Sequence, residues 1–528
     1  MSNLSDEWEW RRRIEPSHFS ASLVNPSITF TYVNLIPKTI FLKFIFGHSI
    51  EIPPKHQLAA SEVANQDDHT SDPASRAAGL APPSRVFSTA FGIAIRPHNE
   101  DSPSEPASQT PFTIITTDLL IPGDGPPVPD AALVLSTKLI VWLGPAASIP
   151  AAYTSTPHKS YAVPYLMPGL WDCHVHFGGD SEAEGSDSFL GFIAEHPAAA
   201  GARLARGCWE AIQRGYTSLH VVTRRRGLRV RGRARDRRRL DRGTECIQRG
   251  LPAGDVLLNL GVANISAGQF GAGMSVIVDG VDECRRAVRL QIRRGARCIK
   301  ILASGGVMSR DDNPLYAQFS PEELRCIVEE ATRQNRAVAA HVHGKPGILA
   351  AVEAGVTTVE HVSFADQECV DLIKEKGTVW IATRTIVDML LQSGGKGLSR
   401  QQWEKAQLCG KNHLAAYKLA IDAGVPIALG TDTPPGFNMA VELDYAVQAG
   451  LSNLEAIKAA TANGPLSVGG QAPKTGQLKV GYEADVLGLL QNPVEDVKIL
   501  QDKTNIGWVW KGGKILKGPG VGPWGEEL

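Results

Sequence analysis

A series of short apolar runs, each with a histidine, lysine or aspartate in or at the end of the run, constrains the fold of this chain more than any other feature. The first run passes Pro168-Gly169 and reaches His174 and His176. Alternate side chains of a strand point the same way, so both imidazoles leave one face at one strand end. Two converging imidazoles are a natural start for a zinc site. One later run contains Lys300 and breaks at residues 304–306, and the others end at His341 and His343, at His361, and at Asp432.

Helical patterns separate these runs. They cover Pro321 to Asn335, Lys345 to Ala354, Asp366 to Lys376 and Gln402 to Ala423. A strand followed by a helix, repeated, predicts a parallel sheet with helices outside it. In a (β/α)8 barrel the carboxyl ends of the strands form the active-site face. We therefore expect an α/β chain with a TIM-like barrel over residues 167–468 and a metal centre at the strand ends.

Both flanks of this region are rich in short strands. Residues 111–166 contain strand-like runs such as Phe112 to Leu120, with a turn at residues 122–125, and residues 469–528 repeat the style. Because both flanks lie outside the barrel, we expect one small β-sandwich built from two pieces of sequence.

Residues 1–110 differ in composition from the rest. Residues 52–110 are rich in Pro, Ser, Ala and Asp, which predicts a disordered extension or linker over 1–110. The start of the chain lacks the cationic-then-apolar order of a signal peptide, so cytoplasmic location and non-classical secretion both stay open. Residues 27–50 are apolar but interrupted by Pro37, Lys38 and Lys43, which predicts no membrane span; an anchoring or targeting role is the alternative.

The overall composition excludes several classes of function. Hydrophobic residues make up 43% of the chain and the formal net charge is −1, as in a soluble globular protein without a global field for nucleic acid. The 8 cysteines contain no Cys-x-x-Cys pairing, so we expect reduced thiols rather than a disulfide framework. Cys173, between metal-site neighbours, is expected to point away from His174 into the packing.

The motifs together resemble those of the metal-dependent amidohydrolase superfamily. They include Leu-Met-Pro-Gly-Leu-Trp-Asp-Cys-His-Val-His-Phe-Gly-Gly-Asp from residue 166, Ala-Ser-Gly-Gly-Val-Met-Ser-Arg-Asp-Asp-Asn-Pro at 303–314, Ala-His-Val-His-Gly-Lys at 340–345 and Ala-Leu-Gly-Thr-Asp-Thr at 428–433. The branch that they resemble holds Xaa-Pro dipeptidases and imidazolonepropionase-like enzymes, and within it the fungal amidases that cleave ochratoxin A. The resemblance covers roughly residues 112–222 and 251–528.

The resemblance implies two divalent metal ions per subunit, with zinc as the expected metal, while the ligand types also admit manganese, cobalt or iron. His174, His176 and Asp432 match the ligands of the first ion, and His341 and His361 match those of the second. Lys300 matches the lysine that carbon dioxide converts to a bridging carbamate, since a free ammonium would be repelled by two cations. A structural ion pair is the alternative for Lys300. The resemblance also implies the composite flanking domain and a large homo-oligomer.

The chemistry expected from such a site is hydrolysis of an amide bond. Two metals that share a water lower its pKa toward neutrality, so that a bridging hydroxide attacks the carbonyl. Asp432 would act as general base and then general acid, and its alternative is a cap on the following turn. His343 could contact substrate or stabilise the oxyanion. A role in which His343 only supports the metal ligands through a hydrogen bond is nearly as favoured. Arg310 and Tyr316 are candidate substrate contacts. Asp312 lies in the same loop and could either contribute to substrate binding or be solvated.

Residues 223–250 depart from the family pattern. An arginine-rich run between Arg224 and Arg242 stands where relatives place a third barrel strand, which indicates a shifted reading frame or a mis-assigned exon. No barrel strand buries such a run.

The leading hypothesis is a carboxypeptidase-like amidase that releases an amino acid such as phenylalanine from a small-molecule N-acyl amide. The alternatives are an Xaa-Pro dipeptidase acting on a dipeptide and a catalytically impaired scaffold.

Overall fold

The computed structural model describes residues 111–177, 197–224, 245–246, 255–259, 275–293, 295–309, 312–522 and 525. The predictions for residues 1–110 and for most of the 223–250 segment fall outside these ranges. Among the described residues no helix has the length and apolar character needed to cross a membrane.

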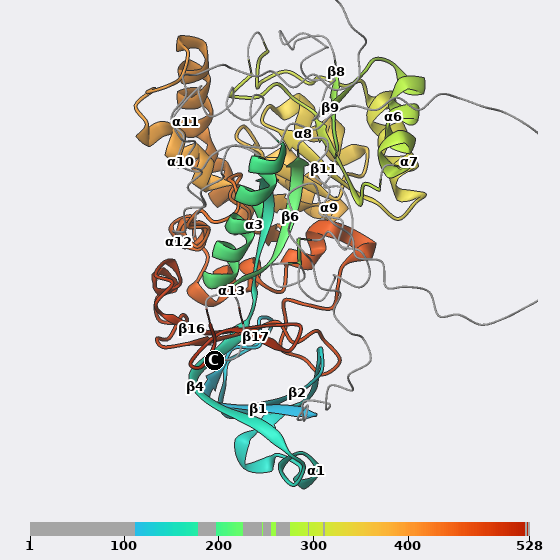
Figure 1. Cartoon of the computed structure of the whole chain (residues 1–528). Helices are drawn as coiled ribbons and strands as arrows, with labels where there is room; N and C mark the ends of the chain where they lie inside the picture. Colours follow the sequence, from blue (N-terminus) through green and yellow to red (C-terminus); the bar gives the residue numbers. More distant parts are fainter. Residues whose placement is uncertain are drawn as a thin grey trace, which may run out of the picture. The chain divides into compact units, whose positions relative to one another are not determined.

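One sheet is built from both flanks of the sequence. Its strand order is β17-β16-β15-β4-β1-β2-β3. The N-terminal strands are β1 (Phe112–Leu120), β2 (Val128–Ser136), β3 (Leu139–Pro145) and β4 (His158–Pro168), and the C-terminal strands are β15 (Val486–Leu489), β16 (Ile506–Lys511) and β17 (Lys514–Lys517). β4 joins the two groups through its antiparallel pairing with β15. In Figure 1 the blue and teal strands accordingly lie beside the red ones. The two flanks that were predicted to form one β-sandwich thus contribute seven strands to one continuous sheet.

The strands that carry the candidate site form two parallel sheets. The larger has the order β14-β13-β12-β11-β10-β8-β9 and the smaller the order β5-β6-β7. Their bounds are β5 Leu170–Phe177, β6 Tyr216–Arg224, β7 Glu245–Cys246, β8 Asp255–Asn259, β9 Ser275–Val278, β10 Cys298–Leu302, β11 Ala337–Val342, β12 Thr358–His361, β13 Val379–Ile381 and β14 Ile427–Ala428. β10 and β11 are buried along nearly their whole length, as expected for parallel strands covered on both faces.

The two parallel sheets approach each other beside the candidate site. The backbone N–H of Cys173 donates to Leu429 at 2.8 Å, and that of Asp432 donates to His174 at 2.8 Å. An isolated parallel bridge also joins Val175 to Thr433. In the described part of the chain no ladder closes the sheets into a ring, so the closed (β/α)8 barrel is not confirmed.

Helices follow the strands as the sequence pattern predicts. The α-helices are α1 (Ala151–Thr154), α3 (Pro197–Gln213), α6 (Val281–Arg293), α7 (Pro321–Thr332), α8 (Lys345–Glu353), α9 (Gln367–Lys376), α10 (Arg384–Gln392), α11 (Arg400–Asp422), α12 (Val441–Gln448) and α13 (Asn453–Ala460). Short 3₁₀ helices cover Ala146–Ser148, Gly464–Gln471 and Val497–Gln501. Local signals set the bounds of these helices: Ser320 and Glu323 form a capping box at the start of α7.

Buried apolar residues hold the parallel strands and their helices together. One large cluster joins residues of β10, β11 and β12 to helices such as α7 and α8. A second cluster fills the flanking sheet, with Trp510 and Leu133 among its members. Cys173 lies in a third cluster with Trp171 and Ile381, turned away from His174 as expected. Among the described residues, free thiols are found at Cys173, Cys284, Cys298, Cys326, Cys369 and Cys409.

Candidate metal centre

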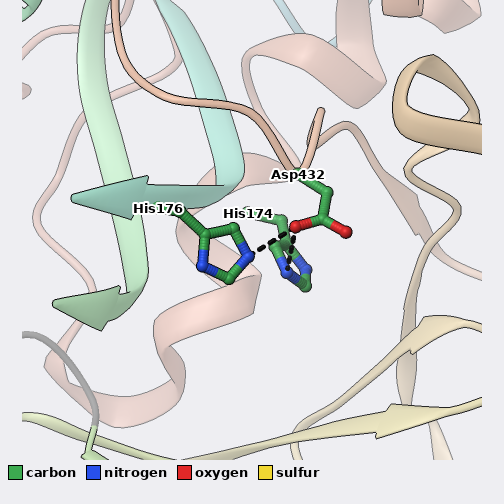
Figure 2. A group of neighbouring side chains, drawn as sticks. All are labelled: His174, His176 and Asp432. Carbon is green, nitrogen blue, oxygen red and sulfur yellow. Dashed lines mark ion pairs between the residues drawn. The ribbon is translucent and has the colours of Figure 1, made fainter. Parts of the chain in front are cut away.

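The end of β5 meets the segment after β14 in a cluster of three ligand-type side chains. The imidazoles of His174 and His176 both approach the carboxylate of Asp432, as Figure 2 shows. The Nε2 atom of His174 lies 3.5 Å from Oδ1 of Asp432, and Nε2 of His176 contacts the same oxygen more closely. The ligand atoms all lie within 4.8 Å of one another. The three side chains are therefore close enough to bind one metal ion.

Asp172 fixes the geometry of this cluster from the buried side. One carboxylate oxygen accepts from the backbone N–H of His174 at 3.0 Å and of Thr431 at 3.1 Å. The other accepts from Oγ1 of Thr431 at 2.7 Å. Asp172 thus ties β5 to the residue before Asp432. Asp432 itself has a left-handed φ of 61°, which aspartate tolerates better than most residues.

Three further histidines lie beside the first pair. The ring of His361 is 5.2 Å from that of His174 and 4.5 Å from that of His341, between centroids. The ring of His343 stacks on His361 at 5.0 Å. Nδ1 of His361 lies 4.0 Å from Oδ2 of Asp432. The structure therefore brings together every histidine that the sequence predicted as a metal ligand.

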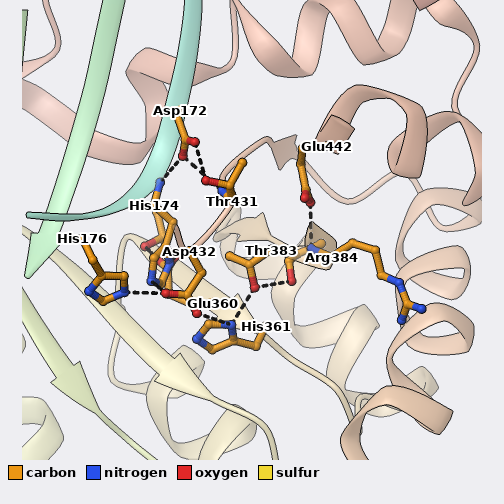
Figure 3. A network of polar contacts seen from close by, with 12 residues as sticks. Asp172, His174, His176, Glu360, His361, Thr383, Arg384, Thr431, Asp432 and Glu442 are labelled. Atoms are coloured by element: carbon orange, nitrogen blue, oxygen red, sulfur yellow. Dashed lines mark hydrogen bonds and ion pairs between the residues drawn. The ribbon is translucent and has the colours of Figure 1, made fainter. Parts of the chain in front are cut away.

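Glu360 is a functional residue that the sequence analysis missed. Its Oε2 lies 2.5 Å from Nδ1 of His174 (Figure 3). Its other oxygen accepts from the hydroxyl of Thr358. The carboxylate accepts the Nδ1–H of His174, which leaves the Nε2 lone pair directed toward Asp432. The available signal was a carboxylate inside a buried strand, immediately before His361.

A left-handed backbone brings Glu360 and His361 to the same site. Neighbouring side chains of a strand point to opposite faces, so both could not face the centre from a regular β12. His361 and Val362 have φ values of 69° and 55°, which end the strand geometry at His361. A left-handed conformation is uncommon for such residues and often marks a functional site.

Thr383 holds the ring of His361, and it too was missed. Oγ1 of Thr383 lies 2.6 Å from Nδ1 of His361 and donates to the carbonyl of Ala382 at 2.7 Å. Because its one proton is used there, Thr383 accepts the Nδ1–H of His361, and Nε2 keeps its lone pair. Glu442 accepts from the backbone N–H groups of Arg384 and Thr385, both at 2.8 Å, and so fixes the residues after Thr383 (Figure 3).

Two buried nitrogens at the centre have no hydrogen-bond partner among the described residues. They are Nζ of Lys300, on β10, and Nε2 of His341, on β11. Lys300 is only 2% exposed. A buried ammonium without a partner costs several kcal/mol, roughly, so burial favours the neutral amine of Lys300 or its contact with a further group.

Burial favours the neutral form of three histidines at this site. It lowers the pKa of His174, His341 and His361 well below the usual value, and the charge of Lys300 acts in the same direction. Burial likewise lowers the pKa of Lys300. Burial acts to raise the pKa of Asp432, but the neighbouring His176 and His174 outweigh it, and that pKa is lowered. Neutral imidazoles beside a carboxylate are the protonation states that metal binding requires.

The residues present fit a metal centre. The neutral imidazoles of His174, His341 and His361, the ionised carboxylate of Asp432 and a lysine without a hydrogen-bond partner among the described residues form a donor set that a cation would satisfy. For Lys300 the alternative was a structural ion pair, and its Nζ has no hydrogen-bond partner among the described residues. The carboxylate of Asp432 contacts the ring of His176.

The candidate substrate contacts differ in their surroundings. Tyr316 is 67% exposed on the loop after β10, and Arg310 lies outside the described residues. His343 is buried beside His341 and contacts Oγ of Ser363 through Nδ1 at 2.9 Å. Asp312, which could have been solvated, instead pairs with Lys405 at 2.7 Å.

Comparison with known proteins shows which families and relatives this chain resembles. The model of the amidohydrolase family matches residues 165–516. The ochratoxinase of Aspergillus niger is 55% identical over 428 residues, which cover 79% of this chain and 88% of the relative. An imidazolonepropionase of Micrococcus luteus is 26% identical over 387 residues, or 69% of this chain and 88% of the relative.

Solved structures give the same grouping. The crystal structure of A. niger ochratoxinase matches with a TM-score of 0.71 and 52% identity, over 79% of this chain and 98% of that one. A prolidase complexed with N-methylphosphonate-L-proline matches with a TM-score of 0.65 and 26% identity, over 77% of this chain and 99% of that one.

Proposed function

The chain belongs to the amidohydrolase family and is a hydrolase of amide carbon–nitrogen bonds, and we propose that it releases an amino acid such as phenylalanine from an N-acyl amide. The observation that carries this proposal is the convergence of His174, His176 and Asp432. The likeness to ochratoxinase supports an aromatic acyl substrate. We further propose a (β/α)8 barrel over residues 167–468, flanked by one domain from residues 111–166 and 469–528.

We propose that the centre holds two divalent ions, of which zinc fits the donor set best. His174, His176 and Asp432 would hold one ion, and His341 and His361 the other. Lys300 would bridge them as a carbamate; its lowered pKa supports this because only the neutral amine reacts with carbon dioxide. When bound, the ions would polarise the scissile carbonyl and lower the pKa of water.

The chain's own residues would then move the protons. Asp432 is 20% exposed, so it can reach both the buried histidines and an entering substrate. It would accept a proton from the attacking water and deliver it to the leaving nitrogen. His343, adjacent to His341, would donate a hydrogen bond to the oxyanion that develops on the carbonyl oxygen.

A comparison of two substrates tests the proposed reaction. The purified chain, supplied with zinc, is incubated with N-benzoyl-L-phenylalanine and separately with alanyl-proline, and the released amino acid is quantified. We expect phenylalanine to be released with the higher kcat/KM. Faster release of proline would favour an Xaa-Pro dipeptidase, which the likeness to the prolidase supports. Metal-loaded protein that releases neither would overturn the amidase proposal and favour a scaffold.

A further inference from the structure

The loop between β10 and α7, called here the 303–320 loop, folds back on itself over the end of the sheet. Residues 303–309 and 312–320 of this loop are described. Ser304 and Ala317 form an antiparallel bridge, and the backbone N–H of Gln318 donates to Ala303 at 2.9 Å. The two ends of the loop are therefore joined at its base.

The 303–320 loop lies directly against the metal centre. A Cβ atom added to Gly306 would lie 3.5 Å from Nε2 of His341. One added to Gly344 would meet the carbonyl oxygen of Leu315 at 2.4 Å. Oγ of Ser304 accepts from the backbone N–H of His343 at 2.9 Å. The position of this loop therefore sets how much room a substrate has beside His341.

Asp312 organises the interior of the loop. Its Oδ2 accepts from the backbone N–H of Gly306 at 2.9 Å and from Oγ of Ser309 at 2.5 Å. Its Oδ1 accepts from Nζ of Lys405 at 2.7 Å. One carboxylate thus connects the residue over His341 to a lysine on another helix, α11.

Lys405 connects α11 to the loop at more than one point. Its Nζ also donates to the carbonyl of Ser309 at 2.7 Å. The side chains of Lys405 and Asp312 are only 9% and 7% exposed. A buried ion pair depends strongly on both partners, because removing one leaves an uncompensated charge.

We propose that Lys405 is a positioning residue that fixes the 303–320 loop over the metal centre and thereby determines which amide substrates the centre accepts. The part about substrates rests on the proposed function. The same loop carries two exposed apolar side chains, Met308 at 42% and Tyr316 at 67%. Apolar side chains beside a polar centre suit the aromatic acyl group of an N-aroyl amino acid. Lys405 thus acts on specificity through the loop, without touching substrate.

The variant Lys405→Met removes the ammonium and keeps an apolar side chain of similar length. Hydrogen exchange measured by mass spectrometry should show the amides of the 303–320 loop exchanging roughly tenfold faster or more. The KM for N-benzoyl-L-phenylalanine should rise roughly tenfold, with a smaller change in kcat. The preference for this substrate over alanyl-proline should shrink accordingly. Lys411→Met, on the exposed face of the same helix, should leave all of these values unchanged.

A double variant separates positioning from general stability. Combining Lys405→Met with Asp312→Asn removes both charges and keeps an acceptor for Gly306. Its thermal stability should recover, whereas fast loop exchange and the raised KM should persist. The proposal would be overturned if the loop amides of Lys405→Met exchanged at the wild-type rate. It would also be overturned if the double variant regained the wild-type KM together with its stability. If the wild type hydrolyses neither substrate, the proposed function fails, and the exchange comparison still decides whether Lys405 fixes the loop.

Discussion

The Nδ1 atom of His361 lies 2.6 Å from the hydroxyl of Thr383, so a residue at the start of α10 sets which ring nitrogen of a candidate metal ligand is free. Thr383 has a φ of 53°, and Glu442 holds the backbone that follows it. The orientation of His361 therefore depends on packing that is distant from the ligands in sequence.

Thr383→Val removes this hydroxyl while keeping the branched shape of the side chain. Without its partner, Nδ1 of His361 no longer fixes the ring, and zinc affinity should fall roughly 10- to 100-fold. Competition with a chromogenic chelator measures the affinity. Thr383→Ser retains the hydroxyl and should stay close to wild type. Equal affinity in the Val and Ser variants would show that the hydrogen bond does not orient the ligand.

Glu360→Gln replaces a charged acceptor of His174 with a neutral one. The imidazole becomes less basic, so zinc affinity should decrease by roughly tenfold or more, by the same chelator titration. The exposed Glu353 on α8 provides a matched control, since Glu353→Gln changes the same group far from the centre. Unchanged affinity in Glu360→Gln would remove Glu360 from the set of supporting residues.

Lys300→Met tests the role of the buried lysine. A carbamate ligand predicts that the variant loses at least one of two bound metal ions, measured by elemental analysis. In metal-free protein the same change replaces a buried amine without a partner by an apolar side chain of similar volume, so Tm should be equal or higher. A lower Tm with unchanged metal content would instead indicate a structural ion pair.

Glu442 makes folding stability depend on pH. Burial raises the pKa of Glu442 from 4.5 to about 7, against the hydrogen bonds from Thr385 and Arg384, and the charge of Asp172 adds to the rise. Between these values the folded chain holds a proton that the unfolded chain has released. Its stabilising contribution is therefore complete below the unfolded pKa and is lost as pH rises to about 7.

Urea unfolding of metal-free protein at pH 4.5 and pH 8 should show this loss. In Glu442→Gln the decrease in unfolding free energy should be smaller by about 3 kcal/mol, from the size of the pKa shift. Glu329→Gln, at an exposed position of α7, should keep the wild-type dependence. A decrease in Glu442→Gln that equals the wild type would show that Glu442 ionises at its ordinary pKa.

The sequence was informative where local pattern decides structure. Alternation in β5 placed His174 and His176 at one strand end, and the helical pattern that begins at Pro321 matched the observed start of α7. Glu360 and Thr383 were missed because their roles come from tertiary contacts. Glu360 reaches His174 across 186 residues of sequence, which no local pattern encodes.

Backbone conformation explains the rest of the difference. Alternation would turn Glu360 and His361 to opposite faces, and only the left-handed φ at His361 brings both to the centre. Asp312 was expected to bind substrate or be solvated, because its partner Lys405 lies 93 residues later. Closure of the barrel was expected from repetition, whereas the described strands form separate sheets.

The most direct test of the account is the metal content and amidase activity of the full chain beside its Asp432→Asn variant. We predict two zinc ions per wild-type chain and release of phenylalanine from N-benzoyl-L-phenylalanine. Asp432→Asn should retain the fold and lose roughly 100-fold or more of kcat, because the proton acceptor is gone. A wild-type chain that binds no divalent metal, or a variant as active as the wild type, would contradict the assignment of this centre.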